Sequence, residues 1–230
     1  MRVIERAVRI GAAGVELEGA LANLPDPELP GVARKGVVIF AHGSGSSRKS
    51  PRNQFVAGVL HDHGFVTLLL DLLADEEQYI ISKRFDISLL ATRLAEAVRW
   101  ARSYPAISSL PIGLFGASTG AAAALRVAAV SDGGVRAVVS RGGRTDMTGS
   151  LRSQVRAPTL LVVGSEDHDV LALNQRSFDQ LNCEKRLAVV PGATHLFEEQ
   201  GALADVAHLA AYWFKAHLTS ESLEAQPGAV

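Results

Sequence analysis

A serine between two glycines is the clearest chemical signal in the sequence. Gly116-Ala-Ser118-Thr-Gly120 follows the apolar run 111–115 and precedes the alanine-rich stretch 121–130. On so tight a strand-to-helix turn the serine hydroxyl projects outward, and the residues two positions away must be small because the chain crowds itself there. We therefore predict that Ser118 is a nucleophile at a helix N-terminus. The alternative is a glycine-rich turn that serves only close packing of the helix on the strand.

A serine hydroxyl needs a base, and the base needs a partner that fixes its tautomer. Of the seven histidines, His195 is the one in a loop that directly follows the last apolar run and precedes the last helical stretch. The order serine, acid, histidine along the chain is the order of strand-end triads on open α/β sheets. His195 is therefore the predicted base, and the acid must lie between it and Ser118.

Three neighbouring carboxylates supply candidates for that acid. The loop 164–170 follows an apolar run and contains Glu166, Asp167 and Asp169. Asp167 is the predicted acid because the spacing Gly164-x-x-Asp167-x-x-Val170 resembles the acid loop of enzymes with such a triad, and Asp169 and Glu166 are the alternatives. Asp146, which follows an earlier apolar run, is a further alternative.

A loop of small residues, 42–47, follows the apolar run 37–41. Such a loop can direct backbone N–H groups at a developing oxyanion, and we expect the N–H groups of Ser44 and Thr119 to do so. The loop also begins like a dinucleotide-binding glycine pattern, but Arg48 stands at the third glycine position and no Gly-Lys-Ser/Thr follows. We expect His42 to order the loop through hydrogen bonds, with a role as the base as the alternative.

Positive charges follow two of the predicted strands. Arg48 comes after the small-residue loop, and Arg141 and Arg144 come after the apolar run that ends near residue 140. Because arginine binds carboxylate and phosphate groups in a bidentate manner, these three are candidates for binding an anionic group of the substrate. The alternative is a solvated rim of charges.

Short apolar runs must position these residues. The runs are too short for helices and too continuous for half-exposed strands, which favours strands of a parallel sheet covered on both faces. They lie at 37–41, 66–70, 112–115, 135–139, 159–163 and 187–190. Before them, residues 6–21 alternate and turn at 11–14, which predicts a β-hairpin at a sheet edge, and a proline-rich connector follows at 23–31.

Helical stretches alternate with these runs, at 53–63, 86–104, 119–131, 172–182 and 198–217. The alternation predicts a doubly wound α/β sheet in which function gathers at the carboxyl ends of the strands. We expect a single domain over 1–218 and a frayed tail at 219–230. Only 19 residues separate the runs 135–139 and 159–163, which is enough for a loop and a short helix.

Composition narrows the class of protein without naming a function. The chain has 230 residues, 47% of them hydrophobic, and 23 Lys+Arg against 24 Asp+Glu. Neither a nucleic-acid partner nor a membrane surface is expected from a net charge of −1 and from apolar runs too short to span a bilayer. The single cysteine, Cys183, excludes an internal disulfide framework, and a cytoplasmic location is the expectation.

Together, the serine turn, the His42-Gly43 loop, Gly164-x-x-Asp167 and Pro191-Gly-Ala-Thr-His195 resemble an α/β-hydrolase, and within that fold the dienelactone hydrolase family and its serine esterase relatives. The resemblance covers residues 36–218. In this fold a lid usually follows the strand after the nucleophile helix, so the short 19-residue connection there implies little or no cap and an open site. Dienelactone hydrolases use a cysteine nucleophile, whereas Ser118 stands at that position and Cys183 lies outside every motif. The resemblance therefore implies carboxylic esters or lactones as substrates rather than dienelactone itself.

The predicted function is that of a serine esterase which forms an acyl-enzyme and needs neither a metal nor an organic cofactor. Its expected partner is a small-molecule ester, and a monomer and a homodimer both remain open. Acyl transfer or perhydrolysis by the same triad is one alternative. A binding protein with a silent hydrolase site is the other.

Overall fold

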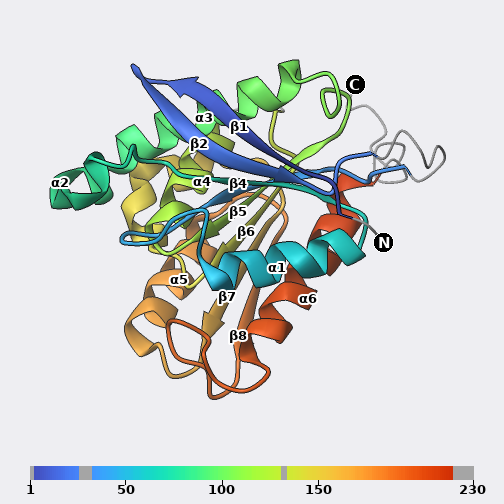
Figure 1. Ribbon diagram of the computed structural model, residues 1–230. Coiled ribbons are helices and arrows are strands. Elements are labelled where there is room, and N and C mark those ends of the chain that lie inside the picture. Colours follow the sequence, from blue (N-terminus) through green and yellow to red (C-terminus); the bar gives the residue numbers. More distant parts are fainter. Residues whose placement is uncertain (1–2, 26–32, 131–133, 220–230) are drawn as a thin grey trace, which may run out of the picture.

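The computed structural model describes residues 3–25, 33–130 and 134–219. These residues form one sheet of eight strands with helices around it. The strands are β1 (Glu5–Ala12), β2 (Val15–Ala22), β3 (Val37–Ala41), β4 (Val66–Leu70), β5 (Ile112–Ala117), β6 (Ala137–Arg141), β7 (Thr159–Gly164) and β8 (Lys185–Val190). They lie in the order β1-β2-β4-β3-β5-β6-β7-β8 (Figure 1). Strands β3 to β8 pair in parallel, and the hairpin β1–β2 adds an antiparallel edge. The predicted mostly parallel sheet with an N-terminal hairpin is confirmed.

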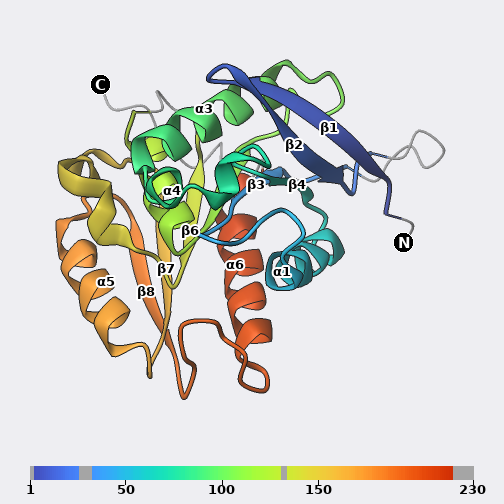
Figure 2. The same cartoon turned by 60° about the vertical axis from the view of Figure 1, so that its left-hand side comes forward.

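Helices cover both faces of this sheet. They are α1 (Pro51–Asp62), α2 (Ile81–Arg84), α3 (Ile87–Ser103), α4 (Thr119–Val130), α5 (His168–Gln180) and α6 (Ala202–Leu218), with the 3-10 helices η1 (Glu77–Tyr79) and η2 (Thr145–Gln154). Helices α1 and α6 lie side by side on one face, and α3 and α4 lie on the other (Figure 2).

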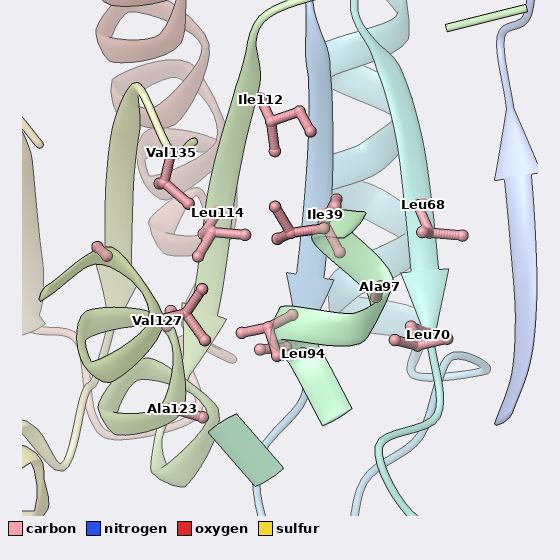
Figure 3. Packing of buried hydrophobic residues seen from close by; sticks show 14 of the residues in the cluster. Ile39, Leu68, Leu70, Leu94, Ala97, Ile112, Leu114, Ala123, Val127 and Val135 are labelled. Carbon is pink, nitrogen blue, oxygen red and sulfur yellow. The ribbon is translucent and has the colours of Figure 1, made fainter. Parts of the chain in front are cut away.

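Apolar side chains of the central strands form two cores, one on each face. Every residue of β3 to β7 is buried, as expected for strands that are covered on both sides. On one face, Ile39 and Leu114 pack under Leu94 of α3 and Val127 of α4 (Figure 3). On the other face, alternate strand residues such as Phe40 pack against α1 and α6. This double burial fixes the register of the strands.

Local signals in the sequence set where several elements begin. The hydroxyl of Ser50 accepts a hydrogen bond from the backbone N–H of Asn53, and Pro51 occupies the first position of α1, so this helix begins with both an N-cap and a favourable proline. The carboxylate of Asp86 caps α3 by accepting from the N–H of Leu89 at 3.0 Å.

Several element boundaries differ from the sequence prediction, and one short segment was missed. Strand β6 runs from Ala137 to Arg141 rather than over 135–139, because Arg141 still pairs with Ala117 of β5. Helix α5 begins at His168 rather than at 172, directly after the acid loop. Helices η1 and α2, between β4 and α3, were not predicted, because three or four residues are too few to give a helical period.

The carboxyl ends of the parallel strands meet at one edge of the sheet, as the α/β alternation predicts. The connection from β6 to β7 contains only η2, so no cap domain is inserted there. No helix in the described ranges is long and apolar enough to cross a membrane. From residue 220 onward the predicted tail lies outside the described residues, as do residues 26–31 of the predicted connector at 23–31.

Candidate active site

Ser118 lies on the turn between β5 and α4 with a φ of +50°, which is strained for a residue other than glycine. The flanking glycines make the turn possible. A Cβ at Gly116 would lie 2.5 Å from Cα of Ala121, and one at Gly120 would lie 2.1 Å from the carbonyl oxygen of Ala41. The predicted need for very small residues at these two positions is confirmed. The serine itself is half-buried, so the turn presents it at the surface of the sheet edge.

The small-residue loop after β3 packs directly on this turn. A Cβ at Gly43 would lie 3.0 Å from Cβ of Ser118. The backbone N–H of Ser44 donates a 2.9 Å hydrogen bond to the hydroxyl of Thr119, which is buried. A substrate oxygen can therefore use the N–H of Ser44 only by sharing this donor with the Thr119 hydroxyl or by displacing that hydroxyl. The N–H of Thr119 lies in the first turn of α4, where backbone N–H groups lack an intrahelical acceptor.

His42 orders the small-residue loop from within. Its Nδ1 lies 2.9 Å from the carbonyl oxygen of Gly43, and its Nε2 accepts a 3.0 Å hydrogen bond from the N–H of Leu72. These partners require the neutral ring with its proton on Nδ1. Burial lowers the pKa of His42, which keeps this form. Both ring nitrogens are engaged in holding the loop, as expected from the sequence.

Asp167 and His195 are brought together from two loops. Nδ1 of His195 lies 2.6 Å from Oδ2 of Asp167. Asp167 is the residue that precedes α5, yet its side chain does not cap the helix and faces the histidine instead. The two loops are joined by a 3.0 Å hydrogen bond from the N–H of Glu166 to the carbonyl of Ala193. A carboxylate at Nδ1 leaves Nε2 of the ring free to exchange a proton with a substrate or nucleophile.

A glycine explains how closely the acid loop and the histidine loop approach. A Cβ at Gly164 would lie 2.1 Å from the carbonyl oxygen of Ala193, so any larger residue at the end of β7 would push the histidine loop away. The hydroxyl of Ser165 adds a second connection by accepting from the N–H of Gly192 at 2.8 Å.

Ser118 and His195 both lie next to the end of β6. The N–H of Ser118 donates to the carbonyl of Arg141 at 3.1 Å, and a Cβ on the next residue, Gly142, would lie 3.4 Å from the ring of His195. In the described part of the chain, no hydrogen bond joins the Ser118 hydroxyl to His195. In enzymes without substrate such contacts are often long and tighten in the Michaelis complex.

The alternative acids lie elsewhere or have other partners. Asp146 forms a two-pronged ion pair with Arg144, at 2.9 and 2.8 Å. Glu166 accepts from the hydroxyl of Ser165 at 2.9 Å, and Asp169 lies in the first turn of α5. None of these three contacts His195 within the described ranges.

A cavity of about 210 Å³ opens beside the small-residue loop. Residues 42–46 form one wall, and Leu73, Tyr79, Arg84 and Leu90 are among those that form the rest. This opposite wall includes the segment of η1 and α2, which was not predicted from the sequence. The cavity therefore combines apolar side chains with one guanidinium next to the predicted oxyanion donors.

A buried ion pair holds that wall in place. Oε2 of Glu77 lies 2.5 Å from Nη1 of Arg93 in α3, which is itself buried, and Lys83 contacts the other carboxylate oxygen at 2.7 Å. These partners, Arg93 above all, lower the pKa of Glu77 to about 2. Only the pairing in three dimensions reveals this connection between η1 and α3.

Two of the three predicted anion-binding arginines already have carboxylate partners. The guanidinium of Arg48 contacts both Asp71 and Glu18, and that of Arg144 contacts Asp146. Arg141 differs: it is the last residue of β6 rather than a loop residue, and it is only 8% exposed. Burial, and then repulsion from Arg52, lower the pKa of Arg141 to about 10, so it is a cation at neutral pH.

Cys183 is remote from these residues. Its sulfur lies 3.7 Å from the hydroxyl of Thr159, the first residue of β7, and hence at the opposite edge of the sheet from Ser118. Burial raises the pKa of the thiol, which keeps it protonated and a poor nucleophile.

Comparison with known proteins assigns a family to this arrangement. The model of the dienelactone hydrolase family matches residues 21–218. The chain belongs to that family. A crystal structure of a dienelactone hydrolase from Anabaena variabilis is similar over 95% of this chain and 100% of that one, with 48% identity and a TM-score of 0.88. Members of this family are hydrolases with the α/β-hydrolase fold, and both the predicted family and the predicted fold are confirmed.

The chain is also similar to proteins with other names. Two Mycobacterium tuberculosis proteins that carry the provisional name phosphoribosyl transferase are 52% identical over 214 residues, which is 93% of this chain but 47% of theirs. The chain thus spans about half the length of these curated relatives. A lidless serine hydrolase from Xanthomonas campestris is 20% identical with a TM-score of 0.72 over 97% of both chains, a similarity that shows the fold alone.

Proposed function

We propose that this member of the dienelactone hydrolase family is a serine hydrolase that cleaves small carboxylic esters or lactones through an acyl-enzyme. The observation that carries the proposal is the 2.6 Å contact between Asp167 and His195, together with the position of both His195 and Ser118, on its strained turn, next to the end of β6. A serine, a histidine and a carboxylate in these relative positions are what nucleophilic catalysis by a hydroxyl requires.

In the proposed reaction, Oγ of Ser118 attacks the ester carbonyl while Nε2 of His195 accepts the hydroxyl proton. Asp167 holds the proton on Nδ1 and stabilises the imidazolium that forms. The N–H groups of Thr119 and Ser44 donate to the oxyanion of the tetrahedral intermediate. His195 then protonates the departing alcohol, and a water molecule, deprotonated by the same histidine, releases the acid and restores Ser118.

The shape of the site favours small esters. The cavity beside the oxyanion loop is about 210 Å³, and the β6–β7 connection supplies no cap over it. With serine instead of cysteine as the nucleophile, ordinary carboxylic esters and lactones are the proposed substrates. Transfer of the acyl group to another acceptor would use the same residues and would be recognised by its product.

The name of the mycobacterial relatives does not lead to a second proposal. The chain matches only part of those proteins, and the part that it matches is the hydrolase family region. Phosphoribosyl transfer is therefore not proposed for the site at Ser118.

Hydrolysis of p-nitrophenyl acetate by purified wild-type protein and by Ser118→Ala tests the proposal. We expect the substitution to lower kcat by at least about a thousandfold, because the acyl-enzyme cannot form. Ser153→Ala, at an exposed serine of η2, is the matched control and should keep wild-type activity. Wild-type turnover by Ser118→Ala would contradict the proposal.

A further inference from the structure

The hydroxyl of Thr119 is a buried group that uses only part of its hydrogen-bonding capacity. Its oxygen accepts the 2.9 Å hydrogen bond from the N–H of Ser44, and the residue is only 1% exposed. A hydroxyl can also donate one hydrogen bond, but within the described residues this one donates to no acceptor. Because buried donors are nearly always paired, the hydroxyl needs an acceptor from outside the chain.

The peptide group between Gly43 and Ser44 is fixed at both ends. The carbonyl of Gly43 accepts from the N–H of Ser46 at 3.1 Å, and Nδ1 of His42 lies 2.9 Å from the same oxygen. At the other end of this peptide, the N–H of Ser44 donates to Thr119. The N–H cannot turn toward another acceptor without breaking the hydrogen bonds to the carbonyl. The hydroxyl of Thr119 is therefore a fixed part of the small-residue loop's contact with the serine turn.

This hydroxyl lies beside both backbone groups that are expected to bind the oxyanion. The N–H of Ser44 contacts it, and the nitrogen of Thr119 itself is joined to the hydroxyl oxygen through only two carbon atoms. Since the N–H of Ser44 points at the hydroxyl, a second acceptor of that N–H must lie next to the hydroxyl oxygen. Two oxygens placed so close repel each other unless a proton lies between them, and the hydroxyl can supply that proton.

We propose that the hydroxyl of Thr119 is a further catalytic group, which donates a hydrogen bond to the oxyanion of the tetrahedral intermediate. The inference rests on the proposed function and adds a side-chain donor to its two backbone donors. The proton stays on the threonine throughout, while the proton of Ser118 passes to His195. The N–H of Ser44 strengthens this donor, because a hydroxyl that accepts a hydrogen bond is polarised by it.

The contribution of the hydroxyl should fall on kcat, because a hydrogen bond to the charged oxyanion is stronger than one to the neutral ester carbonyl. Thr119→Val keeps the branched shape and removes the hydroxyl. We expect it to lower kcat for p-nitrophenyl acetate about a hundredfold and to change KM less than about twofold. Thr119→Ser restores the hydroxyl and should retain most of the activity. An unchanged or raised kcat in Thr119→Val would overturn the proposal, and a raised value would mean that the hydroxyl only competes with the substrate for the N–H of Ser44.

Thr159→Val is the matched control. Thr159 is fully buried at the start of β7, and its hydroxyl donates to the carbonyl of Ala157 at 2.9 Å. The substitution therefore removes a buried hydroxyl at the opposite edge of the sheet, and kcat should stay at the wild-type value. Equal losses of kcat in Thr159→Val and Thr119→Val would overturn the proposal, because the loss would not be specific to the site.

A pair of ketones separates a hydrogen bond to the oxyanion from a change in the position of the loop. 1,1,1-Trifluoro-4-phenylbutan-2-one should add Ser118 and form a tetrahedral oxyanion, whereas 4-phenylbutan-2-one binds as the neutral ketone. In Thr119→Val the Ki of the fluorinated ketone should rise about as much as kcat/KM falls, and that of the neutral ketone should change less than about twofold. Equal weakening of both ketones would mean that Thr119 only positions the loop, and would overturn the proposal.

The outcome for Thr119 can be told apart from the outcome for the proposed function. Loss of activity in Ser118→Ala together with a wild-type kcat in Thr119→Val would leave the acyl-enzyme proposal standing and would overturn the role of the hydroxyl. Wild-type activity in Ser118→Ala would overturn both, since no oxyanion bound to Ser118 would then form.

Discussion

Asp167, which directly precedes helix α5, holds His195 through a contact of 2.6 Å between its Oδ2 and Nδ1 of the ring. The carboxylate of Asp167 accepts no hydrogen bond from the N-terminus of α5, so it is available to the histidine. The close approach of the two loops depends on Gly164, where any Cβ would collide with the carbonyl of Ala193. The orientation of the histidine is thus built into the backbone of β7 and the loop after β8.

Asp167→Asn should lower kcat for p-nitrophenyl acetate by about 10⁴-fold at neutral pH, because an amide stabilises the wrong tautomer of the histidine. Asp169→Asn, two residues further along in the first turn of α5, is the matched control and should retain activity. The assignment of the acid would be wrong if the control lost activity while Asp167→Asn kept it.

His42 should make stability depend on pH. Burial lowers its pKa in the folded protein, whereas the unfolded chain takes up a proton near the ordinary value of 6.5. The unfolded state therefore binds more protons below about pH 6.5, and the free energy of unfolding should fall as the pH decreases through that range. In His42→Gln, an amide can accept from Leu72 and donate to Gly43 without titrating.

Denaturant unfolding at pH 7.5 and pH 5.0 measures this effect. The wild type should lose more stability between the two values than His42→Gln, and the difference isolates His42 from the other histidines. Equal losses in the two proteins would show that the ring already titrates normally in the folded state.

Gly120→Ala should strongly destabilise the protein, because its Cβ would lie 2.1 Å from the carbonyl oxygen of Ala41, which is backbone and cannot rotate away. Gly58→Ala is the contrasting substitution: no atom lies within 4 Å of its Cβ, inside α1. There alanine should raise the free energy of unfolding by about 0.5–1 kcal/mol through helix propensity. Thermal or denaturant unfolding of both variants checks the pair, and similar stabilities would contradict the packing of the serine turn.

The parts of the molecule that depend on local pattern could be predicted from the sequence. The continuous apolar runs give the central strands, and Gly116 and Gly120 give the serine turn because backbone crowding there is local. The order of Ser118, Asp167 and His195 also follows, since each lies directly after a recognisable strand.

The rest depends on contacts between distant segments. The segment of η1 and α2 is fixed by the pairing of Glu77 with Arg93, and no period in its own sequence reveals it. Arg48 is occupied by acids from two other strand regions, so its sequence position at a strand end could not show that it is engaged. The burial of Arg141 becomes visible only when β6 is seen to extend to that residue.

Covalent labelling with a fluorophosphonate probe tests the central claim most directly, because the probe reacts with a serine only when that serine is activated as a nucleophile. After digestion, tandem mass spectrometry of the wild-type protein should locate one adduct, on Ser118. Ser118→Ala should not be labelled, and Asp167→Asn should be labelled far more slowly. An adduct on another residue, or labelling of Ser118→Ala at the wild-type rate, would contradict the assignment of Ser118 as the nucleophile.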